Sequence, residues 1–159
     1  MTRHTYEVVL TWTGSQGAGT QNARSYSRDH VVSADGHHPI DGSSDPAFRG
    51  DPTRWNPEQL YIASIAQCHM LWYLALAAGA GITVTDYRDR PTAVMVEERG
   101  GAGQFESVIL NPVVTVAPGS DEELAERLHH RVGDYCFIAR SVKTPIHHHV
   151  TIRTAPAAP

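Results

Sequence analysis

Two cysteines are the residues of this sequence most able to do chemistry, and the chain of 159 residues has no others. Cys68 lies inside a long apolar segment, and Cys136 stands between Tyr135 and Phe137. Two cysteines cannot form a disulfide framework, but two thiols near charged partners can form a redox pair. The simpler alternative is that both are packed side chains, because free cysteine is among the most buried residue types.

Charged residues just before Cys68 indicate which reaction the thiol could perform. A mid-helix, apolar site disfavours the thiolate, so a nearby cation is needed to offset the desolvation. Arg49 and Arg54 stand directly before this segment, and Glu58 could hold an arginine through two hydrogen bonds. A thiolate, an arginine and a carboxylate suit peroxide reduction, because the arginine polarises the peroxide and stabilises the leaving alkoxide.

The segment around Cys68 is predicted to be a helix over residues 57–78. Asn56 can cap the free amides, Pro57 has its backbone angle preset, and Glu58 complements the helix dipole. The glycines that follow end the helix. The segment is apolar on nearly all sides, which predicts burial. Since one small chain has trouble covering such a helix, the pattern favours a homodimer formed through it.

The remaining segments predict an α+β fold with an antiparallel sheet, in a single domain over residues 1–159. Residues 34–56 form a long loop that we expect to be ordered and functional. Ser120 and the acidic residues after it fit a capping box that opens a second helix ending near Val132. Cys136 then falls on one more helical turn. Strands are predicted over residues 5–13, 24–33, 82–87, 92–98, 104–116 and 149–154.

Charge and composition argue against several classes of protein. The net charge of −4, from 13 Lys and Arg against 17 Asp and Glu, argues against nucleic acid binding. No charged-then-apolar leader opens the sequence, so we expect a cytoplasmic protein. Gln67 and His69 in the middle of the long helix, and the missing basic flank after it, argue against a membrane span.

Ten histidines raise the question of a metal site. His147 and His149 share one face of a strand-like stretch, while His129 and His130 fall on the second predicted helix. No H-x-x-x-H or C-x-x-C spacing occurs, so we predict no metal, no cofactor, and histidines at surface or interface positions. His69 points about 100° away from Cys68 around the helix, and we expect it to be packed or hydrogen-bonded.

The motifs around the cysteines resemble the OsmC/Ohr family of osmotically inducible and organic hydroperoxide resistance proteins. They are Arg49-Gly50, Asn56-Pro57-Glu58-Gln59-Leu60, Gln67-Cys68-His69 and, around the second cysteine, Cys-Phe-Ile-Ala-Arg-Ser-Val from position 136. The resemblance covers the whole chain. It implies an OsmC-like fold in an intertwined homodimer, with central helices packed back to back and active sites at the dimer interface.

The resemblance also implies an activity and roles for particular residues. Cys68 would be the peroxidatic cysteine, Cys136 the resolving cysteine that forms a disulfide with it, and Arg49 and Glu58 the assisting charged pair. The substrate would be an organic hydroperoxide, and the reductant a dithiol such as a lipoyl-bearing protein.

The sequence departs from the family pattern at two positions. Arg49 directly precedes a glycine, whereas many members place the arginine a few residues earlier, so Arg54 and Arg28 remain alternatives. Phe137 follows the second cysteine where many members have proline.

Two other classes of function remain open. A cysteine hydrolase would use Cys68 with a histidine and an aspartate, but it leaves Cys136 without a role. A non-enzymatic dimer of the same fold would sense redox state or bind a small ligand with idle cysteines. Arg49 and Glu58, which flank the end of the long loop, make the hypothesis of a non-enzymatic dimer less favoured.

Overall fold

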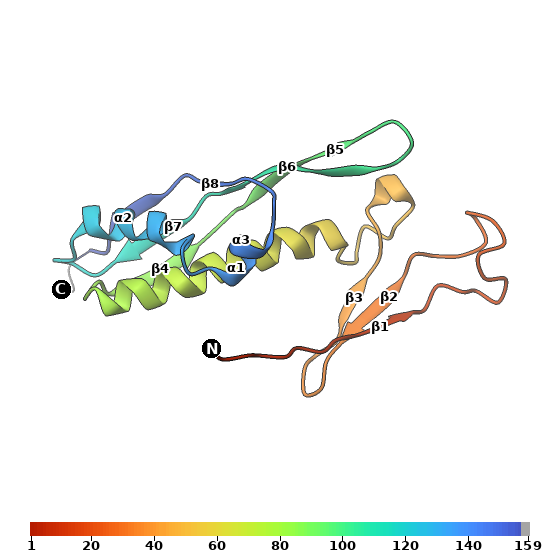
Figure 1. The fold of residues 1–159 in the computed structure, drawn as a ribbon, viewed down its shortest axis with the longest axis horizontal. Helices are drawn as coiled ribbons and strands as arrows, with labels where there is room; N and C mark the ends of the chain where they lie inside the picture. Colours follow the sequence, from red (N-terminus) through yellow and green to blue (C-terminus); the bar gives the residue numbers. More distant parts are fainter. Residues whose placement is uncertain (157–159) are drawn as a thin grey trace. The chain divides into compact units, whose positions relative to one another are not determined.

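The structure is a computed structural model that describes residues 1–156, and its chain falls into two compact units, Met1–Tyr61 and Ile62–Pro159. The first unit is built on a three-stranded antiparallel sheet in the order β1-β2-β3 (Figure 1). Its strands are β1 (Val9–Trp12), β2 (His30–Ser33) and β3 (Ile40–Gly42). A 3-10 helix, η1 (Pro46–Phe48), follows. The prediction of one domain over the whole chain stays a prediction.

The first unit has less regular secondary structure than predicted in one segment and more in another. The predicted strand over residues 24–33 begins only at His30, because turns occupy the residues before it. The predicted loop over residues 34–56 contains β3 and η1. A three-residue strand such as β3 is too short to show the alternation by which strands are recognised.

The second unit contains two three-stranded sheets, in the orders β4-β7-β9 and β5-β6-β8. The pairs β4/β7 and β5/β6 are antiparallel, but β6/β8 and β7/β9 are parallel. The predicted antiparallel pairing is confirmed for β4/β7 and β5/β6, as for the sheet of the first unit, but β8 and β9 join their sheets in parallel. The helical segment between β7 and β8 supplies the crossover that parallel pairing requires. The strands are β4 (Val84–Arg88), β5 (Thr92–Glu97), β6 (Gly103–Leu110), β7 (Val113–Val116), β8 (Ile146–His148) and β9 (Thr151–Thr154).

The long helix α1 (Pro57–Gly79) confirms the prediction for residues 57–78. Asn56 and Gln59 form a reciprocal cap: Asn56 Oδ1 accepts from the Gln59 amide at 2.8 Å, and Gln59 Oε1 accepts from the Asn56 amide at 3.2 Å. At the other end Gly81 adopts φ 76°, which favours glycine, and the Ile82 amide turns back to the Ala77 carbonyl at 2.9 Å.

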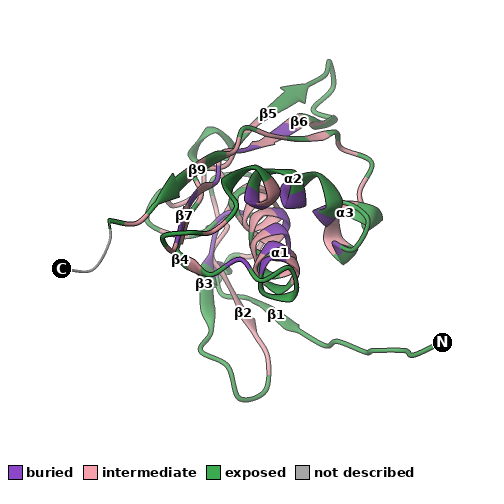
Figure 2. Cartoon of the chain, turned by 90° about the vertical axis from the view of Figure 1, so that its left-hand side faces the viewer, coloured by how far each residue is buried: buried purple, intermediate pink, exposed green. Residues whose placement is uncertain are grey.

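Helix α1 is buried along one stripe within this chain, not on all sides as its sequence predicts. The buried residues Ile65, His69, Tyr73 and Ala77 recur every fourth position. Figure 2 shows the buried positions concentrated around α1, α2 (Glu122–Val132) and the neighbouring strands. Length and composition alone would also let α1 cross a membrane, but the core helix of a soluble protein passes the same test.

The core of the second unit forms where this stripe meets α2 and β7. Its members are apolar residues of α1, β7 and α2, Ile82 from the turn after α1, and Cys136, which precedes α3 (Phe137–Ser141). The core therefore holds the second cysteine against the helix that carries the first. The buried cluster consists of Tyr73, Ala77, Ile82, Val114, Val116, Ala125, Leu128, Val132 and Cys136.

Three boundaries in this unit differ from prediction for local reasons. The predicted strand over residues 104–116 breaks into β6 and β7 at Pro112, which has no amide hydrogen to donate. The predicted last strand over residues 149–154 is β9, which begins at Thr151, and β8 lies before the predicted range. Helix α2 is capped by Asp121 rather than Ser120, and the Asp121 carboxylate accepts from the Leu124 amide at 2.8 Å.

Candidate thiol active site

The two cysteines lie side by side as free thiols. Cys136 Sγ donates a hydrogen bond to Cys68 Sγ over 2.8 Å. A disulfide bond is about 2.05 Å long, so the two sulfurs need to move only a short distance toward each other to form one. The structure thus brings together the two residues that the sequence nominated as a redox pair.

Local structure fixes the position and protonation of Cys136. It is the N-cap of α3 rather than a residue on that helix as predicted, and its Sγ accepts from the Ala139 amide at 3.4 Å. Burial, and then the hydrogen bond to Cys68, raise the pKa of the Cys136 thiol to about 11. Cys136 therefore keeps its proton near neutral pH and presents it to Cys68, whose side chain is less buried.

An aromatic cluster of Trp72, Tyr135 and Phe137 lies beside the thiols. Trp72 follows Cys68 by four residues on α1, so the two share a helix face. Its ring centroid lies 5.4 Å from that of Tyr135 and 5.7 Å from that of Phe137. Phe137 is 67% exposed, so an apolar surface remains open next to the sulfurs. The sequence signalled this cluster only through the positions of aromatic residues around each cysteine.

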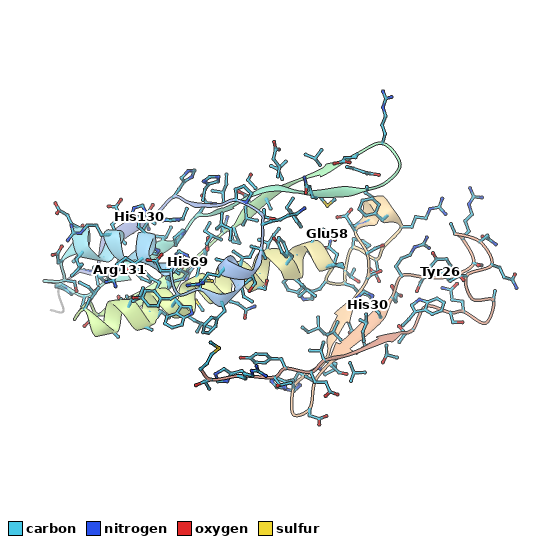
Figure 3. All side chains as sticks on the ribbon, viewed as in Figure 1. Tyr26, His30, Glu58, His69, His130 and Arg131 are labelled. Atoms are coloured by element: carbon cyan, nitrogen blue, oxygen red, sulfur yellow. The ribbon has the colours of Figure 1, made fainter. Side chains whose placement is uncertain are left out.

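Arg49 and Glu58 belong to the first unit, and neither has a counter-charge there. Arg49 ends η1 with a left-handed φ of 66°, and Gly50 follows where a Cβ would meet the Ser44 carbonyl. The Arg49 guanidinium is exposed and donates a hydrogen bond of 3.3 Å to the Ala23 carbonyl. Glu58 lies in the first turn of α1 (Figure 3), and its buried Oε2 has no hydrogen-bond partner within residues 1–156.

The two alternative arginines are occupied by other groups of the first unit. Arg54 lies among Asp29, Asp41 and Asp51, with nitrogen-to-oxygen distances of 3.9, 3.5 and 3.6 Å. Arg28 donates to two backbone carbonyls and lies 4.3 Å from the ring centroid of Tyr26. Both side chains are therefore held by contacts within the first unit.

Four histidines of the second unit form a cluster that the sequence did not predict. His69 Nε2 and His129 Nδ1 share a hydrogen bond of 2.9 Å, and Tyr73 stacks on His129 with centroids 3.7 Å apart. The prediction that His69 is packed or hydrogen-bonded is confirmed, since it is both. The prediction of surface histidines is wrong for His129, which is fully buried. His130 and His148 complete the cluster, with ring centroids 5.0 Å apart; Figure 3 labels His69 and His130 on their two helices.

This cluster is expected to make the fold less stable in acid. Burial, with a contribution from neighbouring histidines, lowers the pKa of His69 to about 4 and that of His129 to about 3. Below the ordinary pKa of 6.5 the unfolded chain binds protons that the folded chain refuses, so the free energy of unfolding falls as pH falls. We expect a loss of about 2 kcal/mol per histidine between about pH 6.5 and 5.

Urea unfolding at several pH values measures this loss. His129→Gln should flatten the pH dependence, whereas His37→Gln, at an exposed position, should leave it as in the wild type. Equal slopes in wild type and His129→Gln would contradict the assignment of the pH dependence to the cluster.

Comparison with known proteins identifies the class to which this fold and thiol pair belong. The OsmC-like protein family model matches residues 50–151, so the chain belongs to the OsmC-like family. The resemblance found in the sequence is thereby confirmed. No curated protein sequence matches the chain.

Solved structures confirm the OsmC-like fold. An OsmC-like protein of unknown function from Vibrio cholerae matches with a TM-score of 0.81 and 28% identity, over 94% of this chain and 99% of its own. An organic hydroperoxide resistance protein from Elizabethkingia anophelis matches with a TM-score of 0.66 and 18% identity, over 97% and 100%. The organic hydroperoxide resistance protein OhrB of Bacillus subtilis matches with a TM-score of 0.59 and 20% identity, over 94% and 98%.

Proposed function

We propose that the protein is a thiol peroxidase that reduces organic hydroperoxides to alcohols. The observation that carries this proposal is the hydrogen bond of 2.8 Å from the Cys136 thiol to Cys68 Sγ. The two thiols also differ in their surroundings, since Cys136 is buried with a raised pKa and Cys68 is less buried. Membership of a family that includes organic hydroperoxide resistance proteins supports the same activity.

The reaction takes place in one oxidation by the hydroperoxide, one condensation of the two cysteines and one reduction by a dithiol. The Cys68 thiolate attacks the distal oxygen of the hydroperoxide, the O–O bond breaks, and the alkoxide leaves and takes up a proton to become the alcohol. Cys68 is then a sulfenic acid. The Cys136 sulfur attacks it, loses its proton, and forms the Cys68–Cys136 disulfide as water leaves. A dithiol returns two electrons and two protons, and is itself converted to a disulfide.

The surroundings of the thiols favour an organic substrate. Trp72, Tyr135 and Phe137 offer an apolar surface on which the organic group of a hydroperoxide can be buried, and hydrogen peroxide has no such group. A dithiol reductant, such as a lipoyl-bearing protein, suits a buried disulfide because its second thiol completes the exchange within one molecule. A cytoplasmic location, where such reductants keep thiols reduced, fits this cycle.

A hydrolase receives less support from the same residues. A cysteine hydrolase needs a histidine that takes the proton from its nucleophile. His69 is the histidine next to Cys68, but its Nε2 is engaged with His129. The hydrolase also gives no part to the thiol pair.

Steady-state assays with different peroxides test the proposed function. With a dithiol reductant, we expect consumption of cumene hydroperoxide to exceed that of hydrogen peroxide by at least about tenfold, because the aromatic cluster binds only the former. A monothiol reductant should support slower turnover. Failure to consume any organic hydroperoxide with any dithiol would contradict the proposal.

The proposed enzyme is a homodimer, and its active site includes Arg49 and Glu58. Within residues 1–156 the Arg49 guanidinium has no carboxylate partner, and the buried Glu58 Oε2 has no hydrogen-bond donor. A carboxylate is the partner that Arg49 lacks, and a donor such as arginine is the partner that Glu58 lacks. The exposed apolar strand β1 and the uncovered faces of α1 supply surface for an intertwined dimer.

Leu71 offers a test of this dimer. It is 60% exposed, and it lies about 200° around α1 from the buried His69. In a monomer Leu71→Lys would change stability by no more than about 0.5 kcal/mol. In a dimer with packed central helices, Leu71→Lys would bury a charge at the interface. The variant should therefore sediment as a monomer at micromolar concentrations where the wild type sediments as a dimer. Leu10→Lys, at an exposed position of β1, tests the contribution of that strand to the dimer in the same way. A folded wild-type monomer under these conditions would contradict the proposed dimer.

A further inference from the structure

A cleft of about 530 Å³ in the second unit is lined by three arginines, and the proposed reaction does not use it. Arg88 comes from the end of β4, Arg90 from the turn after β4, and Arg153 from β9. All three side chains are exposed, in a chain whose net charge is −4. Gathering like charges around one cleft costs stability, so the arrangement indicates a role in binding.

The pairing of the strands places two of these arginines on one face of the sheet. Strands β4 and β9 lie on either side of β7 (Figure 2). Arg88 is opposite Val113 of β7, and Arg153 is opposite Thr115, two residues further along β7. Val114, between them, is fully buried in the core, and successive side chains of a strand point to opposite faces. Both arginines therefore lie on the face of the sheet that points away from the core, one on each side of β7.

Hydrogen bonds hold the turn that carries Arg90. The Asn111 amide donates to Asp89 Oδ1 over 2.7 Å, and Asn111 Nδ2 donates to the Arg90 carbonyl over 2.9 Å. These two bonds join the turn after β4 to the turn between β6 and β7. One wall of the cleft is thus fixed before any ligand arrives, which lowers the entropy lost on binding.

The carboxylates near the cleft compensate its positive charge only in part. Asp86 contacts Arg88 over 3.6 Å, but both side chains are exposed, and ion pairs in water are weak. Asp89 has one oxygen bonded to the Asn111 amide and the other buried. The ion pairs within residues 1–156 include neither Arg90 nor Arg153. The guanidinium groups of these two arginines are therefore available to an anion.

The geometry and the charge of the cleft indicate the kind of anion. A guanidinium group binds a carboxylate or a phosphate through parallel hydrogen bonds. A phosphate group carries up to about two negative charges, so it competes for Arg88 better than a carboxylate, which only equals Asp86 in charge. Arginines on both sides of β7 suit two linked phosphate groups. The cleft volume falls within the range of about 300–1,000 Å³ for small-molecule sites, which leaves room for an organic group.

We propose that this cleft binds the diphosphate group of a small molecule, with Arg88 and Arg153 donating to it from either side of β7 and Arg90 from the turn. The organic part of the molecule occupies the rest of the cleft. The proposal goes beyond the peroxidase function and does not rest on it, since the cleft lining contains no residue of the thiol site.

Calorimetry on the reduced, full-length protein tests the proposal with inorganic pyrophosphate as the probe, in buffer freed of divalent cations. We expect one pyrophosphate per subunit with submillimolar affinity. Inorganic phosphate, with one phosphate group, should bind at least about tenfold more weakly. Citrate carries several carboxylates and controls for charge alone, and it should also bind at least about tenfold more weakly. Raising the salt concentration should weaken pyrophosphate binding, because the charges are exposed.

Variants of the arginines connect the binding to the cleft. Arg153→Gln and Arg90→Gln should each weaken pyrophosphate binding at least about tenfold, since each removes charge-assisted hydrogen bonds. Arg153→Lys keeps the charge but loses the planar fork, so its affinity should fall between those of Arg153→Gln and the wild type. Arg99→Gln removes an exposed arginine from the turn between β5 and β6 and should change nothing.

Several outcomes would overturn the proposal. They are no binding at millimolar pyrophosphate, citrate binding as tight as that of pyrophosphate, and equal affinities in the wild type, Arg153→Gln and Arg90→Gln. A wild type that ignores pyrophosphate but sediments as a smaller species after Arg153→Gln would assign the arginines to a subunit interface instead.

Discussion

Replacing Cys68 by serine is expected to reduce the consumption of organic hydroperoxides to the uncatalysed rate. A serine hydroxyl is not ionised near neutral pH and cannot become a sulfenic acid, so the first step has no nucleophile. Cys136→Ser should instead permit one rapid turnover, after which Cys68 stays a sulfenic acid and is oxidised further by excess hydroperoxide. Single-turnover mixing with cumene hydroperoxide, followed by the mass of each protein, measures both outcomes.

The two variants also control for each other. Cys136 is fully buried and caps α3, and serine can cap a helix as well, so Cys136→Ser removes the thiol and keeps the cap. Its melting temperature should be recorded to show that the buried hydroxyl does not unfold the protein. Wild-type activity in Cys68→Ser would refute the assignment of the nucleophile. Repeated turnover by Cys136→Ser with the same dithiol would remove the resolving role from Cys136.

Arg49→Lys and Glu58→Gln are expected to slow the first oxidation step by about 10²–10³-fold while leaving the fold intact. Lysine keeps the positive charge but loses the planar fork that can bind a carboxylate and a peroxide oxygen together. Glutamine removes the charge that would hold the arginine in place. Stopped-flow measurement of the first step separates these effects from resolution and reduction.

Matched variants at exposed positions show whether the effect belongs to these sites. Arg99→Lys and Glu98→Gln make the same changes at exposed positions near the turn between β5 and β6, and their rates should equal that of the wild type. Arg54→Lys should lower stability through its three aspartate contacts without slowing oxidation. A rate within twofold of wild type in Arg49→Lys, with a slow Arg54→Lys, would transfer the role to Arg54.

Local signals in the sequence predicted the parts of the fold that depend on neighbouring residues. Asn56 and Gln59 cap α1 within one turn, and the glycines after it end the helix, so its bounds were predictable. The parallel pairings of β8 and β9 were not, because they join segments far apart in the chain. Pro112 was visible in the sequence, and its missing amide hydrogen is a sufficient reason to divide the predicted strand.

The site shows the same division between local and distant information. The family resemblance nominated Cys68 and Cys136, and the structure places their sulfurs in contact. The histidine cluster was missed because His69 and His129 are 60 residues apart, and their meeting depends on how α1 packs against α2. An apolar stripe on α2 that includes His129 was the available signal, since a histidine at a core position has to find a polar partner.

Anaerobic titration of the reduced protein with one equivalent of cumene hydroperoxide per subunit tests the proposed thiol chemistry at its source. Free thiols, released cumyl alcohol and the peptide map are measured on the same sample. We expect one alcohol per subunit, loss of both thiols, and a Cys68–Cys136 disulfide that a dithiol reverses. Two thiols that survive the titration, or alcohol released without this disulfide, would contradict the proposed peroxidase cycle.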